Sequence, residues 1–204
     1  MTIFNKEIIT EEDIEKLISE KTEESINLEF KAAGSFDSGS AKKREMGKDV
    51  SAFANSAGGI LIYGIEEIDH IANAKSFIDG NKFTKEWIEN VLHTNIHRKI
   101  EGLEIIPIRF EDKFEKTIYV IRIPESNDAP HMAGNKYYKR YNFKAQPMEE
   151  YEIRQLYNRT RITRLEIADQ LIIKNVSVAG PRNKPKSLAY DLSILDYPLS
   201  LIHI

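Results

Sequence analysis

The segments ESINLEFK (residues 24–31) and DVSAFANSAGGILIYGIEE (residues 49–67) carry the clearest structural signals in this chain. Apolar and polar residues alternate along the first segment, which predicts a strand with Glu29 on its polar face. Glu24 stands immediately before that strand, and Glu67 ends the second segment. The two segments therefore bring three carboxylates next to elements that we expect to be well buried.

A long helix and a central strand are predicted within the second segment and the residues just before it. Apolar residues recur at intervals of three and four, which is the pattern of one buried helix face. Gly58 and Gly59 end this helix, because glycine adopts the positive φ angles found at helix C-termini. The following ILIYGI is apolar on both faces, as expected for a strand in the middle of a sheet. The residues of the helix stripe are Met46, Val50, Phe53, Ala54 and Ala57.

The remaining pattern predicts further helices and strands in an α+β arrangement. Helices are expected after Thr10, which is suited to cap a helix N-terminus, after Thr84, and from Pro147 onward. Apolar runs at residues 102–110 and 116–124, separated by an acidic turn, predict a β-hairpin. We therefore expect one mixed, mostly antiparallel sheet packed with helices.

The structural signals weaken beyond about residue 160. Residues 1–160 are expected to form one domain, and residues 161–204 are expected to form a C-terminal extension. No regular period runs through the extension, which leaves two interpretations open. It is either the truncated start of a second domain or a segment whose closing LSLIHI does not belong to the native protein.

Composition excludes several classes of protein. The chain has 204 residues, of which 41% are hydrophobic and 30% are charged, as in soluble globular proteins. No run approaches the roughly 18 apolar residues of a membrane helix, and no apolar segment near the N-terminus resembles an export signal. Cysteine is absent, which excludes disulfides and thiolate metal sites and favours a reducing, cytoplasmic location.

Charge is distributed unevenly along the chain, although the net charge is only −3. Residues 1–34 contain four Lys and nine Asp or Glu, whereas residues 131–165 contain eight Lys or Arg and three Glu. The two segments could form faces that bind different partners. The alternative is that both are ordinary solvated surface.

The two segments quoted above, together with PHMAGNKYYKRYNFKAQPMEEYEI (residues 130–153), resemble the Schlafen-group AlbA-type domain over roughly residues 10–158. The family includes RNA-cleaving enzymes as well as proteins regarded as DNA-binding transcriptional regulators. In its nucleases three carboxylates form the catalytic site, and the matching positions in this chain are Glu24, Glu29 and Glu67. The third position commonly holds Asp, and the longer Glu side chain displaces the carboxylate by roughly an ångström.

The chemistry of three neighbouring carboxylates favours a metal site. Two unit charges about 4 Å apart repel by about 4 kcal/mol at an effective dielectric constant of about 20, and a divalent cation would convert that repulsion into coordination. Hard oxygen ligands suit Mg²⁺ or Mn²⁺, which could activate a water for attack on a phosphodiester. Lys31 would then contact the phosphate. The alternative is that Glu24 and Glu67 are solvated and that Lys31 only pairs with Glu29.

The basic and aromatic segment KYYKRYNFK (residues 136–144) is the candidate nucleic-acid-binding strand. Lys and Arg neutralise phosphates, and Tyr rings stack on unpaired bases. The candidate contacts are Lys136, Tyr138, Arg140 and His131. The alternative is an edge strand that its charges keep soluble.

These observations lead to two functional hypotheses. The first is a metal-dependent endoribonuclease that acts on tRNA or another structured RNA, and a homodimer is the assembly implied by longer family members. Its catalytic residues would be Glu24, Glu29, Glu67 and Lys31. The second is a non-catalytic DNA-binding module of a transcriptional regulator or sensor protein. ATP binding is not expected, because no G-x-x-x-x-G-K-[ST] motif occurs in the chain.

Overall fold

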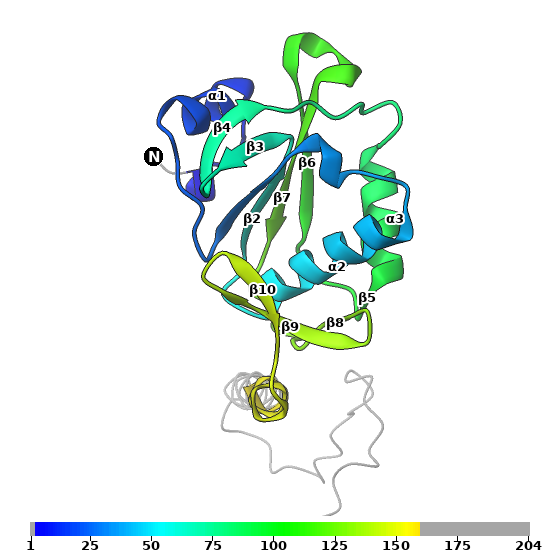
Figure 1. The fold of residues 1–204 in the computed structure, drawn as a ribbon. Helices are drawn as coiled ribbons and strands as arrows, with labels where there is room; N and C mark the ends of the chain where they lie inside the picture. Colours follow the sequence, from blue (N-terminus) through cyan, green and yellow to red (C-terminus); the bar gives the residue numbers. More distant parts are fainter. Residues whose placement is uncertain (1–2, 160–204) are drawn as a thin grey trace, which may run out of the picture. The chain divides into compact units, whose positions relative to one another are not determined.

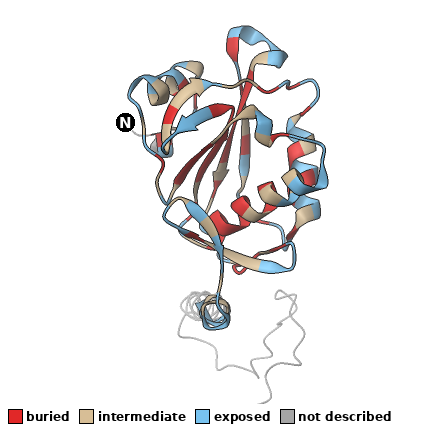
Figure 2. Ribbon diagram, in the orientation of Figure 1, coloured by how far each residue is buried: buried red, intermediate tan, exposed pale blue. Residues whose placement is uncertain are grey.

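Strand β2 (Gly59–Tyr63) lies at the centre of a four-stranded sheet in the computed structural model, which describes residues 3–159 (Figure 1). β1 (Leu28–Lys31) runs parallel to β2, while β7 (Thr117–Ile123) and β6 (Glu104–Arg109) run antiparallel to their neighbours. The strand order is β1-β2-β7-β6. Most side chains of β2 are buried, because apolar clusters cover both faces of the sheet (Figure 2).

Apolar clusters form on both faces of this sheet. On one face, α2 (Ser40–Ala54) and α3 (Lys85–Asn95) pack against apolar side chains of β2, β6 and β7. On the other face, α1 (Glu11–Ser19) and the hairpin of β3 (Ile65–Ile68) and β4 (Ile71–Lys75) close a second apolar cluster. Removal of this apolar surface from water is the main stabilising contribution to the fold. None of the helices between residues 3 and 159 is long and apolar enough to cross a membrane.

A second four-stranded sheet, in the order β10-β9-β8-β5, lies beside α2. β9 (Lys136–Tyr141) and β10 (Lys144–Pro147) form an antiparallel hairpin, and β8 (Met132–Ala133) and β5 (Ile96–His97) complete the sheet. Short 3₁₀ helices span Ile3–Asn5, Ala33–Ser35, Phe110–Asp112 and Phe114–Lys116.

The predicted α+β class is confirmed, and several predicted elements lie where they are expected. β6 and β7 form the predicted hairpin, and Thr84 caps α3 by accepting a hydrogen bond from the N–H of Trp87 at 3.2 Å. The long helix ends before Gly58, whose φ angle is 67° and where an added Cβ atom would lie 2.6 Å from the backbone nitrogen of Glu125. Only glycine fits this position without strain.

Other features differ from the prediction. The strands form three sheets instead of one, because the chain turns at Gly64, where φ is 109°, and β3 and β4 then form a separate hairpin. Ile26 precedes β1 and is exposed instead of buried. Pro147 ends β10, and the last described helix begins at residue 150. The prediction for residues 161–204 falls outside the described residues.

Asn55, just after α2, joins the second sheet to the rest of the protein. Its carboxamide donates to the C=O groups of His131 (2.8 Å) and Tyr138 (2.9 Å) and accepts from the N–H of His131 (2.6 Å). The Asn55 side chain is buried. Because buried polar groups need partners, these hydrogen bonds fix β9 and the segment before β8 against the end of α2.

Replacement of Asn55 with Ala is expected to lower the free energy of unfolding by about 3 kcal/mol, because it leaves buried backbone groups without partners. Urea denaturation at fixed pH measures this change. The matched control is Asn90→Ala on the exposed surface of α3, which should change stability by no more than about 0.5 kcal/mol. An equally small effect of Asn55→Ala would contradict the role assigned to its side chain.

Candidate functional site

The carboxylate of Glu29 on β1 is buried and makes two ion pairs. One oxygen lies 2.6 Å from Nζ of Lys31, and the other accepts from the guanidinium of Arg140 on β9. The same guanidinium also donates to the C=O groups of Ser25 and Ile26. Two cations therefore neutralise Glu29, and one of them comes from the second sheet.

Asp49 of α2 adds a second carboxylate to this group. Its Oδ2 lies 3.7 Å from Nζ of Lys31, and its Oδ1 lies 3.4 Å from Nζ of Lys48. Oδ2 is buried and accepts no hydrogen bond from the residues that the structure describes. Burial raises the pKa of Asp49 to about 6, the charge of Glu29 adds to this increase, and the two lysines oppose it. Burial alone would lower the pKa of Lys31, but the charges of Glu29 and Asp49 raise it above its usual value.

Glu24 is also buried, and its two oxygens have different partners. Oε1 accepts from the N–H of Phe30 at 2.8 Å, and Oε2 lies 2.6 Å from Nδ1 of His70. The backbone also joins the pair, because the N–H of Glu24 donates to the C=O of His70 at 2.7 Å. Phe143, from the turn between β9 and β10, stacks on the imidazole with the ring centroids 4.4 Å apart.

Glu67 of β3 is exposed, and its Oε2 accepts from the N–H of His70 at 2.7 Å. The structure therefore brings Glu24 and Glu67 to the same residue, whereas the partners of Glu29 come from β1 and β9. Sequence analysis missed His70. The polar pair Asp69-His70 between two strands is a turn signal, but nothing in the local sequence indicates that the imidazole faces Glu24.

The three predicted metal ligands do not form a metal-binding group in this arrangement. Among residues 3–159, no three His, Cys, Asp or Glu side chains are grouped so that they could hold one ion. Each carboxylate oxygen of Glu24 and Glu29 already has an N–H group or a cation of the protein as a partner. Binding of Mg²⁺ or Mn²⁺ therefore stays a prediction from the sequence.

The four predicted nucleic-acid contacts differ in accessibility. Lys136 is exposed and Tyr138 is half-buried, but Arg140 and His131 are buried. The ring of His131 bonds to Oγ of Ser126 at 2.7 Å, and burial lowers the pKa of His131. Because β9 packs against α2, the face that carries Arg140 is turned into the protein. The expectation that Arg140 and His131 contact nucleic acid directly does not fit this structure.

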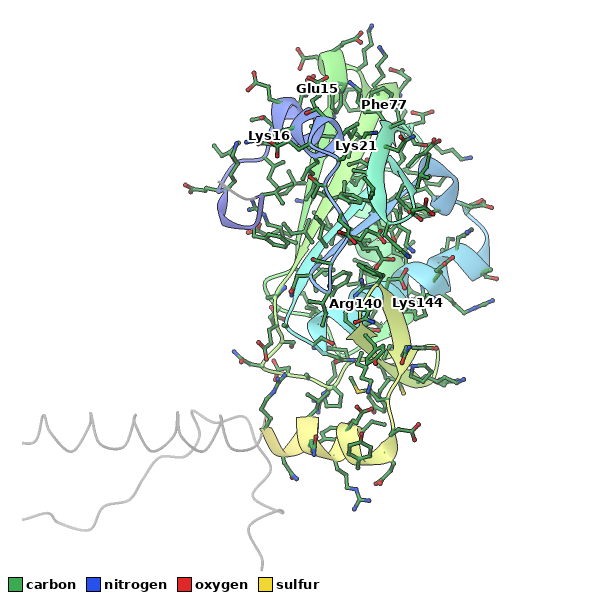
Figure 3. All side chains as sticks on the ribbon, turned by 60° about the vertical axis from the view of Figure 1, so that its left-hand side comes forward. Glu15, Lys16, Lys21, Phe77, Arg140 and Lys144 are labelled. Carbon is green, nitrogen blue, oxygen red and sulfur yellow. The ribbon has the colours of Figure 1, made fainter. Side chains whose placement is uncertain are left out.

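Two accessible residues flank the turn of the β9–β10 hairpin. Tyr141 is 57% exposed, and Lys144 is exposed as well. Figure 3 shows Arg140 and Lys144 on neighbouring strands of this hairpin. The predicted basic and aromatic strand is present. Tyr141 and Lys144 lie on the face of the hairpin opposite to Arg140, and they form part of its solvent-accessible surface.

Residues 24–149 match the family model described as Schlafen, AlbA_2, and the match spans more than half of the chain. The chain belongs to the Schlafen AlbA_2 family. This family is generally related to nucleic acids. The matched residues include β1, β2 and the β9–β10 hairpin, so the Schlafen AlbA_2 region contains every residue of the site described above.

Among solved structures, the Schlafen AlbA_2 chain is similar to the DIP2311 protein from Corynebacterium diphtheriae. The two share 14% sequence identity with a TM-score of 0.48, and the similarity covers 70% of this chain and 27% of that protein. This chain therefore corresponds to much less than two thirds of the length of DIP2311. No curated protein matches the chain.

The raised pKa of Asp49 predicts that its contribution to stability falls as pH rises. The usual pKa of Asp is 3.8, whereas Asp49 titrates near pH 6 in the folded protein. The folded state therefore binds more protons than the unfolded state between these values. This contribution is fully present below about pH 4 and is lost as pH rises through about 6.

Asp49→Asn removes this titration. The quantity to compare is the unfolding free energy of the wild type minus that of the variant. This difference should be about 2 kcal/mol lower at about pH 7.5 than at about pH 4.5. Urea denaturation of both proteins at the two pH values measures the difference. If wild type and variant show the same pH dependence, Asp49 does not titrate near pH 6.

Proposed function

We propose that this Schlafen AlbA_2 domain binds RNA along the β9–β10 hairpin and cleaves it beside the acidic residues that the hairpin contacts. The observation that carries the proposal is that this one hairpin contacts Glu29 directly and also contacts the partner of Glu24. Arg140 binds Glu29, and Phe143 stacks on His70, the partner of Glu24. Membership of a family related to nucleic acids supports the same function.

The accessible side chains of the hairpin suit a nucleic-acid strand. Lys136 and Lys144 can neutralise phosphates, and the exposed ring of Tyr141 can stack on an unpaired base. The buried Arg140 positions this surface without touching the strand. A structured RNA with unpaired loops, such as tRNA, offers the splayed bases that aromatic stacking requires.

Cleavage is proposed beside Glu24 and Glu67, because both residues converge on the turn next to the hairpin. A requirement for Mg²⁺ or Mn²⁺ is proposed from the family resemblance alone, and no step of the cleavage is assigned to an ion. Pairing of two copies is proposed by analogy with longer relatives, and it would place two hairpins along one RNA.

A non-catalytic DNA-binding module is the second candidate, and one observation favours it. Lys31 and Arg140 neutralise Glu29 inside the protein, which is typical of a structural ion pair. In this case the hairpin would bind DNA and no strand would be cut, as in a regulator or a sensor protein.

The double variant Lys136→Gln, Lys144→Gln is expected to weaken RNA binding at low salt, whatever the RNA sequence. Loss of two phosphate contacts should reduce the slope of log K against log salt concentration by about 1.4 to 1.8. Fluorescence anisotropy with labelled tRNA at several salt concentrations measures both effects. Lys85→Gln on α3 is the control for loss of a surface charge, and an equal effect there would contradict the assigned surface.

Incubation of the chain with end-labelled tRNA, in the presence of Mg²⁺, Mn²⁺ or EDTA, tests the proposed cleavage. The wild type is expected to cut the RNA, and Glu24→Gln should reduce the rate at least about 100-fold while RNA binding persists. Loss of cleavage in EDTA would support the proposed metal requirement. Binding of RNA and DNA without any cleavage would overturn the enzyme proposal and favour the DNA-binding module.

A further inference from the structure

The turn between β3 and β4 holds a histidine where the backbone favours glycine. Asp69 and His70 connect the paired residues Ile68 and Ile71, and their φ angles are 51° and 65°. Two-residue turns with positive φ at both positions usually place glycine second, because a β-carbon is disfavoured there. Such strained positions cluster at functional sites. The backbone geometry of the turn therefore gives no reason for a histidine at position 70.

Four contacts fix His70 in one orientation. Its N–H donates to Glu67, its C=O accepts from the N–H of Glu24, and its Nδ1 lies 2.6 Å from Oε2 of Glu24. Its ring lies on Phe143 with an angle of 16° between the two planes. These contacts come from the segment before β1, from β3 and from the β9–β10 turn, so His70 is held by three separate parts of the fold.

The hydrogen bond between Glu24 and His70 determines which nitrogen of the ring can react. An ionised carboxylate only accepts hydrogen bonds, so Nδ1 carries the hydrogen of the neutral ring and Nε2 keeps its lone pair. The His70 side chain is 41% exposed, whereas the Glu24 side chain is only 5% exposed. The pair thus consists of an accessible base and a buried carboxylate that orients it, the arrangement used in general base catalysis.

The surface around His70 suits a nucleotide. Each of the three segments that meet at the imidazole exposes an apolar or aromatic side chain within two residues of its contact. These side chains are Ile26, Ile68 and Tyr141. Lys144 follows Phe143 directly in the sequence, and its side chain is exposed. Aromatic and apolar surface with an adjacent cation can hold an unpaired base and its phosphate.

We propose that His70 is the general base of the RNA cleavage proposed above and that Glu24 is its positioning residue. The proposal rests on that function and requires an RNA with a free 2′-hydroxyl group. Nε2 of His70 takes the 2′-hydroxyl proton, the 2′-oxygen forms a bond to phosphorus, and the bond from phosphorus to the 5′-oxygen breaks. The leaving oxygen takes a proton from water, and His70 later releases its proton to solvent. The products are a 2′,3′-cyclic phosphate and a 5′-hydroxyl end.

Two variants separate this role from a structural one. His70→Gly removes the imidazole and relieves the backbone strain, and His70→Asn keeps a side chain that tolerates positive φ and can donate to Glu24. Both are expected to retain tRNA binding, while the single-turnover cleavage rate falls about 100-fold or more. His70→Asn, which keeps a donor for the buried Glu24 carboxylate, is also expected to retain the wild-type melting temperature. His93→Asn, an exposed histidine on α3, is the matched control and should keep the wild-type rate.

Chemical rescue and product analysis complete the test. Added imidazole is expected to restore part of the cleavage rate of His70→Gly and to leave the wild-type rate unchanged. Mass spectrometry of the fragments should show 2′,3′-cyclic phosphate ends, and an RNA with a single 2′-deoxy nucleotide at the cleavage position should resist cleavage there.

The possible failures are distinguishable. If the wild type cleaves tRNA and His70→Gly cleaves it equally fast, the general-base role is wrong and the proposed function stands. Fragments with only 3′-hydroxyl or linear 3′-phosphate ends at the earliest times also reject the role of the 2′-hydroxyl. If the wild type cleaves no RNA, both proposals fail. If His70→Gly is inactive but melts at a lower temperature and imidazole does not rescue it, His70 is structural.

Discussion

The buried ion pair between Glu29 and Arg140 holds the candidate site together. It joins β1 of the central sheet to β9 of the second sheet, and the guanidinium also binds the backbone just before β1. A buried charge that loses its partner is costly, whereas a paired one is tolerated. Lys31 and Asp49 extend the pair into a group of alternating charges. The position of the β9–β10 hairpin therefore depends on a carboxylate of another sheet.

This constraint also sets the position of the hairpin turn. With Arg140 fixed, Phe143 lies three residues further on and stacks on His70, which in turn binds Glu24. The carboxylates of the first segment thus have separate roles, since Glu29 anchors the hairpin and Glu24 orients an imidazole. Glu67 fixes the backbone of the same turn. A site that resembles an acidic cluster in sequence is, in space, a set of carboxylates with separate partners.

Features that depend on neighbouring residues could be predicted from the sequence. The helix that follows Thr84, the end of the long helix before Gly58 and the β6–β7 hairpin are of this kind. Burial of Arg140 was not predictable, because alternation shows which residues share a face but not which face packs against α2. The pairing of Glu24 with His70 joins residues 46 positions apart, which no local pattern encodes.

The separation of Glu29 and Arg140 by 111 positions has a consequence for synthesis of the protein on the ribosome. Local hairpins such as β6–β7 form early, because little chain entropy is lost in closing them. Glu29 emerges long before Arg140, so it stays without its guanidinium partner until β9 has been translated. The site is therefore among the last parts of the domain to assemble, and a nascent chain that stops before Phe143 has the carboxylates but not the surface proposed to bring RNA to them.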